Sequence, residues 1–201
     1  MARNRKLPVS YYQQDDVVQL ARSFLGKYLM TNIGGIITGG IITETEAYAG
    51  ITDRASHAYN GLRSKRTETM YREGGISYIY LCYGMHHLFN IVTNKKDIPH
   101  AVLVRGIFPV TGTEQMQQRT GKKTTGYELT NGPGKLTKAL GITTKLDRTP
   151  LTGNIIWIED RGIICHDSDI TTGPRIGVAY AKEDALLPYR FVLNPENYLN
   201  P

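Results

Sequence analysis

Apolar residues in the first quarter of the chain recur first with the spacing of a helix and then with the alternation of strands. After the acidic pair Asp15-Asp16, apolar side chains follow at helical intervals up to residue 25, and Gly26 comes next. Acids at the start and a glycine at the stop mark helix ends, so we predict a helix over residues 17–25. The glycine-bounded, β-branched runs 27–31 and 35–47 predict two strands joined by an Asn-Ile-Gly-Gly turn.

The middle of the chain predicts a β-hairpin with an aromatic tip. Residues 76–83 alternate around tyrosines, Tyr83 and Gly84 form a turn, and residues 88–92 resume a strand pattern. Further strands are expected at 101–105, 153–159 and 161–165, and further helices at 113–118 and 134–140. Strands outnumber helices without regular alternation, which favours an α+β (mixed α/β) fold. Because no repeat or linker divides the chain, we expect one domain over residues 1–201.

Composition and charge limit the classes of protein to which the chain can belong. Its 201 residues are 40% hydrophobic and 21% charged, which excludes a disordered or collagen-like chain. No apolar run reaches the roughly 18 residues that span a bilayer, and residues 1–10 lack the apolar stretch of a secretory signal. We therefore expect an intracellular protein without membrane contact. The formal net charge of +6 favours polyanionic partners.

Two glutamates on the strand predicted at 35–47 are the first candidates for chemistry. Glu44 and Glu46 are two residues apart, so their carboxylates project from the same face of the strand. Hydrolysis of a glycosidic bond uses paired carboxylates. Two acids with this spacing also occur on solvent-exposed strand faces that have no catalytic role. Arg105 ends the apolar run 102–104, so its guanidinium must reach solvent or find an acidic partner. Paired with Glu44 or Glu46, it would keep that carboxylate ionised, as a general base requires.

Aromatic and basic residues favour a nucleic-acid partner. The chain has 13 tyrosines against 4 phenylalanines, and tyrosine rings can stack on bases. Tyr83, at a hairpin tip, is placed like the wedges that unstack a duplex step. The basic residues expected at a nucleic-acid backbone are Arg63, Lys65, Arg66 and Lys135. The chain has no P-loop and no zinc-deaminase motif, and we expect neither a metal nor a cofactor.

These residues occur in the order found in the alkyladenine (3-methyladenine) DNA glycosylases, a family that the chain resembles over roughly residues 7–198. The segments that carry the resemblance are 43–48, 55–57, 78–80, 83–85, 90, 102–105, 131–136 and 175–178. An ordered set of this kind is far more specific than any one motif. The resemblance implies one compact domain whose curved, mainly antiparallel sheet is surrounded by helices and carries a protruding β-hairpin.

The resemblance also implies roles for residues near the paired carboxylates. Glu46 looks like the general base that deprotonates the attacking water, and Arg105 looks like its electrostatic partner. Ile176 would offer its backbone carbonyl to that water, and Tyr83 would fill the gap left by a flipped nucleotide. Glu44 receives no role, and we expect it to be a structural hydrogen-bond acceptor.

A pocket for the flipped base is implied in the same way. Tyr48, His57 and Tyr80 look like its stacking walls. Asn90 looks like its floor, where its bulk would clash with the 2-amino group of normal guanine. Ala55 and His57 would donate backbone or ring hydrogen bonds to the edge of the base.

The function implied is base-excision repair of DNA. The protein would flip damaged purines, such as 3-methyladenine and 7-methylguanine, out of duplex DNA and hydrolyse the N-glycosidic bond; hypoxanthine and ethenoadenine are further candidate lesions. Alkylation makes the purine cationic, so the base leaves easily and is attracted to aromatic walls. The enzyme would be a monofunctional monomer of the cytoplasm and nucleoid, or of a eukaryotic nucleus, and it would leave an abasic site without cutting the strand.

Two other functions fit parts of the pattern. A non-catalytic nucleic-acid-binding module needs only the basic charge and the tyrosines, so Glu46 would be incidental. A carbohydrate hydrolase would use Glu44 and Glu46 as an acid/base pair and would not need the basic clusters.

Overall fold

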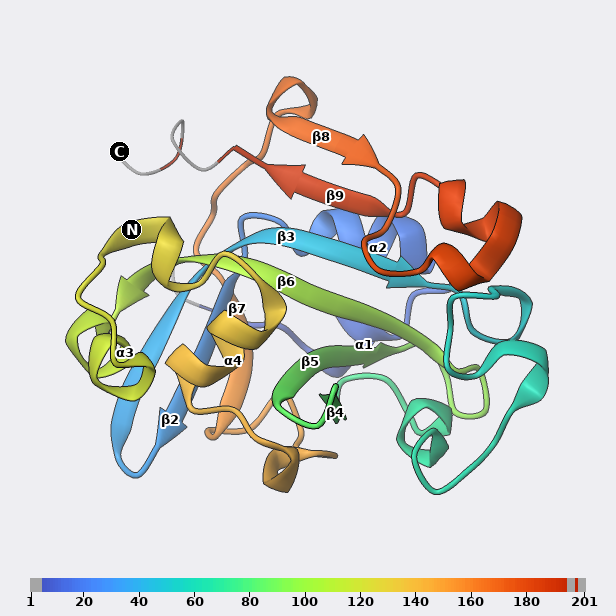
Figure 1. Cartoon of the computed structure of the whole chain (residues 1–201), viewed down its shortest axis with the longest axis horizontal. Coiled ribbons are helices and arrows are strands. Elements are labelled where there is room, and N and C mark those ends of the chain that lie inside the picture. Colours follow the sequence, from blue (N-terminus) through green and yellow to red (C-terminus); the bar gives the residue numbers. More distant parts are fainter. Residues whose placement is uncertain (1–4, 195–197, 199–201) are drawn as a thin grey trace.

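Figure 1 shows the computed structural model of the chain, in which a large sheet carries helices on both of its faces. The structure describes residues 5–194 and 198, so the parts of the predicted 1–201 domain at 1–4, 195–197 and 199–201 lie outside the described residues. The described strands are β1 (Arg5–Lys6), β2 (Tyr28–Ile33), β3 (Ile36–Tyr48), β4 (Ser77–Cys82), β5 (His86–Thr93), β6 (His100–Thr111), β7 (Ile156–Asp160), β8 (Ile170–Gly173) and β9 (Arg190–Leu193). The described α-helices are α1 (Val9–Tyr12), α2 (Val17–Ser23), α3 (Thr113–Thr120) and α4 (Pro133–Leu140). Short 3-10 helices are η1 (Gly50–Thr52), η2 (Tyr59–Gly61), η3 (Glu68–Tyr71), η4 (Gly126–Leu129), η5 (Thr144–Leu146), η6 (Asp167–Asp169) and η7 (Ala179–Leu186).

The strands of the described residues pair antiparallel in the order β1-β7-β2-β3-β6-β5-β4, and β9 links β3 to β8. This arrangement confirms the predicted α+β fold with a mainly antiparallel sheet. The strand β3 lies at its centre. β6 pairs with it along one edge, while β2 takes the first half of the other edge and β9 takes the second half.

The predicted hairpin between β2 and β3 is confirmed, with a tight turn at Gly34 and Gly35. Both glycines have positive φ, 66° and 80°, which residues with a Cβ adopt only with strain. Such a turn twists the two strands in the direction that a sheet requires. The sequence signal for this hairpin was local, and tertiary packing did not override it.

The strand β6 continues well past Arg105, where the sequence analysis ended it. Gly106 and Pro109 resemble strand breakers in the sequence, but the register between β3 and β6 shifts beside each of them. These β-bulges accommodate residues that a regular ladder would exclude. One bulge leaves Arg105 without a directly paired residue, opposite Glu44 and Thr45.

The helices α2 and α4 cover opposite faces of the sheet (Figure 1). The start of α2 is fixed by Asp16, whose side chain accepts from the N–H groups of Val18 and Gln19 at 2.9 and 3.0 Å. Its inner face, with Leu20 and Ala21, joins the same buried core as Leu136 of α4. No helix in the described part of the chain is long and apolar enough to cross a membrane.

Residues 161–165 do not form the predicted strand. Directly after β7, Gly162 has a φ of 82° and its N–H donates to Asp160 Oδ1 at 2.8 Å, which turns the chain out of the ladder. Both edges of β7 are already paired, with β1 and with β2. The strands β1, β8 and β9 were not predicted from the sequence. Each of them is too short to show a pattern of alternating side chains.

Candidate active site

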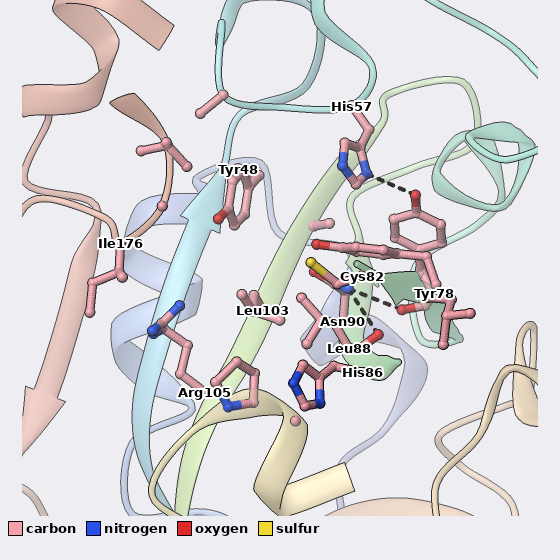
Figure 2. Close-up of a pocket in the computed structure, with 18 of the residues that line it drawn as sticks. Tyr48, His57, Tyr78, Cys82, His86, Leu88, Asn90, Leu103, Arg105 and Ile176 are labelled. Carbon is pink, nitrogen blue, oxygen red and sulfur yellow. Dashed lines mark hydrogen bonds between the residues drawn. The ribbon is translucent and has the colours of Figure 1, made fainter. Parts of the chain in front are cut away.

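A cavity of about 730 Å³ is lined by residues of β3, β6, the hairpin β4–β5 and the start of α4. This volume is within the range of small-molecule sites in proteins. Most of the residues singled out in the sequence line it, namely Tyr48, Ala55, His57, Arg66, Tyr80, Tyr83, Asn90, Arg105, Lys135 and Ile176. Figure 2 shows Tyr48, Arg105 and Ile176 on one side of this cavity and His57, Tyr78 and Asn90 on the other.

Glu46, on β3, is fully buried and is not among the residues that line the cavity, but its carboxylate contacts residues that are. The Ile176 backbone N–H donates to its Oε1 at 2.7 Å, and the Tyr48 hydroxyl donates to its Oε2 at 2.8 Å. The Arg105 guanidinium lies 3.3 Å from Oε1. Each of these donors favours the ionised form of the acid.

Burial raises the pKa of the Glu46 carboxyl above its ordinary value, although Arg105, the Ile176 N–H and the Tyr48 hydroxyl act in the opposite direction. A raised pKa makes a carboxylate a stronger proton acceptor. Burial and the neighbouring Glu46 raise the pKa of Tyr48 well above its ordinary value. Tyr48 therefore keeps its proton and remains a donor.

Arg105 contacts both glutamates of β3, whereas the sequence left open which of them it would pair with. Its Nε donates to Glu44 Oε1 at 2.7 Å, and another nitrogen of the same guanidinium faces Glu46. Glu44 accepts a second bond, 2.7 Å long, from Arg190 Nε. The expectation that Glu44 is a hydrogen-bond acceptor agrees with this geometry, and its donors are two cations.

A buried ion pair holds the segment that carries Ile176. The side chains of Arg175 and Asp53 are 0% and 2% exposed, and both guanidinium NH groups donate to the carboxylate. The Ala55 N–H also donates to Asp53, at 2.9 Å. The backbone N–H of Ala55, expected to donate to a base, is therefore already engaged. The Arg175 guanidinium also lies over the Tyr48 ring, 4.9 Å from its centroid, and so braces this wall.

The opposite wall is a cluster of aromatic side chains that are joined by a hydrogen bond and by ring contacts. His57 Nδ1 and the Tyr78 hydroxyl are 2.9 Å apart, and the centroids of His57 and Tyr80 are 4.7 Å apart (Figure 2). Arg66 approaches His57 Nε2 at 3.2 Å and lies over the Tyr80 ring, 4.8 Å from its centroid. Since a guanidinium can only donate, Nε2 is the acceptor and Nδ1 carries the ring proton toward Tyr78.

We expect the His57 ring to stay neutral at neutral pH. Burial and then the Arg66 cation lower the pKa of His57 to about 4 from its ordinary 6.5. Because the folded value is the lower one, this group's contribution to stability is complete above the ordinary value and is lost as the pH falls toward the folded value. An NMR titration of the ring should have its midpoint near 4 and Arg66→Gln should raise it; an ordinary midpoint in the wild type would contradict this assignment.

Asn90, on β5, lines the cavity and is buried. Its Nδ2 donates to the backbone oxygens of Tyr78 and Leu88 at 3.2 and 3.5 Å. The amide oxygen is then the polar atom that Asn90 can offer to a ligand.

The four basic residues expected at the DNA backbone are placed differently from one another. Arg66 and Lys135 line the cavity, and Lys65 lines a neighbouring depression that Arg66 shares. Arg63 is engaged elsewhere, because it donates to Glu68 and Asp97. Tyr83 is 86% exposed at the tip of the hairpin, with a φ of 50°.

Some residues of the site have no signal in the sequence, because their partners are distant in the chain. Arg175 and Asp53 are separated by 122 positions, and Arg190 and Glu44 by 146, so no local spacing indicated either pair. Tyr180 lines the cavity and donates to the Ala55 carbonyl, and it too had no sequence signal. Among the residues that the structure describes, no group of three or more His, Cys, Asp or Glu side chains is placed to hold a metal ion.

Comparisons with known proteins agree with one another. The sequence model of the family described as methylpurine-DNA glycosylase (MPG) matches residues 10–197. A protein of Chlamydia felis named "Putative 3-methyladenine DNA glycosylase" is 48% identical over 189 residues, which cover 94% of this chain and 96% of that protein. Proteins of the same name from Clostridium perfringens and Bacillus thuringiensis are 39% and 42% identical, over 97% and 92% of this chain and 98% and 93% of their own lengths.

Proposed function

The chain belongs to the methylpurine-DNA glycosylase family, and from that premise we propose that it excises alkylated purines, 3-methyladenine and 7-methylguanine among them, from duplex DNA. The observation that carries the proposal is the fully buried Glu46 carboxylate, which accepts hydrogen bonds from Tyr48 and Ile176 in the lining of a cavity with aromatic walls. The target nucleotide must leave the helix to reach such a cavity.

Glu46 is the general base of the proposed reaction. Burial keeps its proton affinity high, while Tyr48 and Ile176 hold its two oxygens. The carboxylate takes a proton from a water molecule, and the water oxygen attacks C1′ as the bond to the purine breaks. Because the alkylated purine is already cationic, its departure needs no general acid, metal or cofactor. No amine takes part, so the product is an abasic site in an intact strand.

The aromatic walls bind the flipped base. Tyr48 lies on one side of the cavity and His57 on the other (Figure 2), and the ring of Tyr80, which also lines the cavity, contacts that of His57. Their electron-rich faces attract a cationic purine by about 0.5–2 kcal/mol. Asn90, at the floor, is the group proposed to exclude the 2-amino group of guanine. Hypoxanthine and ethenoadenine, which are neutral, would depend more on hydrogen bonds in this pocket.

The DNA backbone is proposed to lie across the mouth of the cavity. Arg66 and Lys135 border the cavity directly, and Lys65 lies next to it. Arg63 would have to leave Glu68 and Asp97 to contact a phosphate. We also propose that one copy of the chain suffices, which sedimentation of the protein bound to a single-lesion duplex will check.

The Tyr83→Ala variant should lose excision from duplex DNA while keeping its fold. An 86% exposed side chain contributes little to stability, so the free energy of unfolding should change by less than about 0.5 kcal/mol. Without the wedge, unstacking of a base step, which costs a few kcal/mol, is no longer compensated. Single-turnover excision from duplex should therefore fall by at least about tenfold, and excision from a single strand should not. Tyr59→Ala, another exposed tyrosine outside the cavity lining, is the matched control.

The proposed function is tested by release of free base from methylated duplex DNA with a chelator present. Expected products are 3-methyladenine and 7-methylguanine, together with abasic sites that become strand breaks only after alkali. DNA binding without release would favour the non-catalytic binding module. Release with strand cleavage in the absence of alkali would contradict the monofunctional reaction. Hydrolysis of an oligosaccharide, but not of DNA, would favour the carbohydrate hydrolase.

A further inference from the structure

The carboxylate of Glu44 joins two arginines that come from different strands. Arg105 Nε and Arg190 Nε both donate to Glu44 Oε1, each at 2.7 Å. The side chains of Glu44 and Arg105 are only 10% and 12% exposed, and that of Arg190 is 28% exposed. Short charge-assisted bonds at such burial define the position of each group more strongly than a surface ion pair does.

The sheet itself imposes this arrangement. In its second half β3 is flanked by β6 and by β9, so arginines from both neighbouring strands reach the glutamates of β3. The bulge that leaves Arg105 unpaired in the ladder redirects its side chain toward them. Arg190 is the residue of β9 directly opposite Glu46, yet its side chain bonds Glu44.

Glu44 therefore competes with Glu46 for one guanidinium. Arg105 makes its short bond, 2.7 Å, to Glu44 and a longer contact, 3.3 Å, to Glu46. A guanidinium bound to Glu46 by two parallel bonds would occupy both carboxylate oxygens. Each of these oxygens already accepts one bond, from the Ile176 N–H or the Tyr48 hydroxyl, so two further bonds from the guanidinium would leave no room for the water molecule that a general base must contact. The bond to Glu44 holds Arg105 close enough to favour the charge of Glu46 but not bound to both oxygens.

The geometry points to Glu44 as a positioning residue for the proposed base excision: it anchors Arg105 at a fixed distance from Glu46 and is itself anchored by Arg190. This inference rests on the proposed function. It differs from a role as acid partner of Glu46, because Glu44 acts here only by accepting hydrogen bonds from the two arginines.

Other charged and titratable groups also face Glu46, and they stay in place in the test. They are Tyr48 on β3, Arg175 in the loop before η7, and Tyr180 on η7. None of them bonds Glu44 in the described residues. Substitution of Glu44 therefore affects the pKa of Glu46 in two ways: through the lost charge of Glu44 and through the position of Arg105.

The Glu44→Gln variant should move the acidic limb of the pH–rate profile to lower pH and lower the plateau. The limb follows the pKa of Glu46, and that pKa falls when a neighbouring negative charge is removed and Arg105 is released toward Glu46. The plateau of single-turnover base release falls by about 10- to 100-fold, because the freed guanidinium occupies the oxygens of the base. A shifted limb with a wild-type plateau would overturn the inference that Glu44 positions Arg105, because the charge of Glu44 alone would then explain the result.

The Arg190→Gln variant provides a second test with the opposite sign. Glu44 then has Arg105 as its only cationic partner and draws it from Glu46, while a positive charge is lost from the site. Both effects raise the pKa of Glu46, so the acidic limb moves to higher pH. An unchanged limb would overturn the inference even if Glu44→Gln does not fold.

Glu159→Gln is the matched control. Glu159 is 7% exposed on β7 of the same sheet, where it accepts from Arg161 and Trp157. Loss of this carboxylate should affect the melting temperature as much as Glu44→Gln does, and it should leave the pH profile unchanged. If Glu159→Gln moves the limb in the same way, the effect is a general loss of stability and the inference fails. An inactive wild type would instead refute the proposed function, so the two failures are distinguishable.

Discussion

The Glu46→Gln variant should release alkylated bases about 10²- to 10⁴-fold more slowly than the wild type in single-turnover assays, the range that a general base contributes. Glutamine occupies nearly the same volume as glutamate and can still contact Tyr48 and the Ile176 N–H, but it cannot accept a proton from water. Binding of DNA that carries an uncleavable lesion should persist. Release of bases by this variant at the wild-type rate would show that Glu46 is not the general base and that another group accepts the proton.

The same substitution should not destabilise the fold at neutral pH, which separates a chemical effect from a folding defect. Because burial raises the pKa of Glu46 in the folded state, the acid's contribution to stability is complete below the ordinary pKa of a glutamate and is lost as the pH rises through the folded value. Glutamine does not ionise, so the difference in unfolding free energy between the variant and the wild type should shift in favour of the variant as the pH rises through the folded value of Glu46. A large fall in the melting temperature at pH 7 would contradict this assignment.

The Asp53→Asn variant should lose about 3–5 kcal/mol of unfolding free energy, the cost of leaving a buried charge without its partner. Arg175 is fully buried, and its two NH groups donate to the Asp53 carboxylate. Activity should fall as well, even at temperatures where the variant is folded, because Arg175 immediately precedes the Ile176 N–H that bonds Glu46. Urea unfolding followed by circular dichroism measures the first effect.

The control for this prediction is an exposed ion pair of the same chemistry. Asp167, whose side chain is 93% exposed, pairs with Arg22 at 2.7 Å. Asp167→Asn should change stability by at most about 1 kcal/mol and should leave excision unchanged. Equal losses in the two variants would mean that burial of the Asp53–Arg175 pair is not what makes it important.

The elements with a strong local signal were predictable from the sequence. Asp16 caps α2, two glycines with positive φ make the β2–β3 turn, and the tyrosine-rich hairpin ends at Tyr83. The prediction failed where a strand needs a partner that the sequence does not reveal. Residues 161–165 have a strand-like pattern but no free edge beside them, and β9 is a strand because β3 and β8 flank it.

The order of the residues is enough to show which chemical groups the protein has and which of them are neighbours in the chain. Glu44 and Glu46 share a strand face, Tyr83 occupies a turn, and both follow from spacings of a few residues. The residues that surround the two glutamates are brought there by the fold. A bulge positions Arg105, the strand β9 carries Arg190, and a buried ion pair with Asp53 holds Arg175. The two kinds of information differ in the distance along the chain over which they act. Backbone geometry repeats over two to four residues, whereas Arg105 and the Ile176 N–H, which act on the pKa of Glu46, are far from it in the chain and meet it only when the sheet forms.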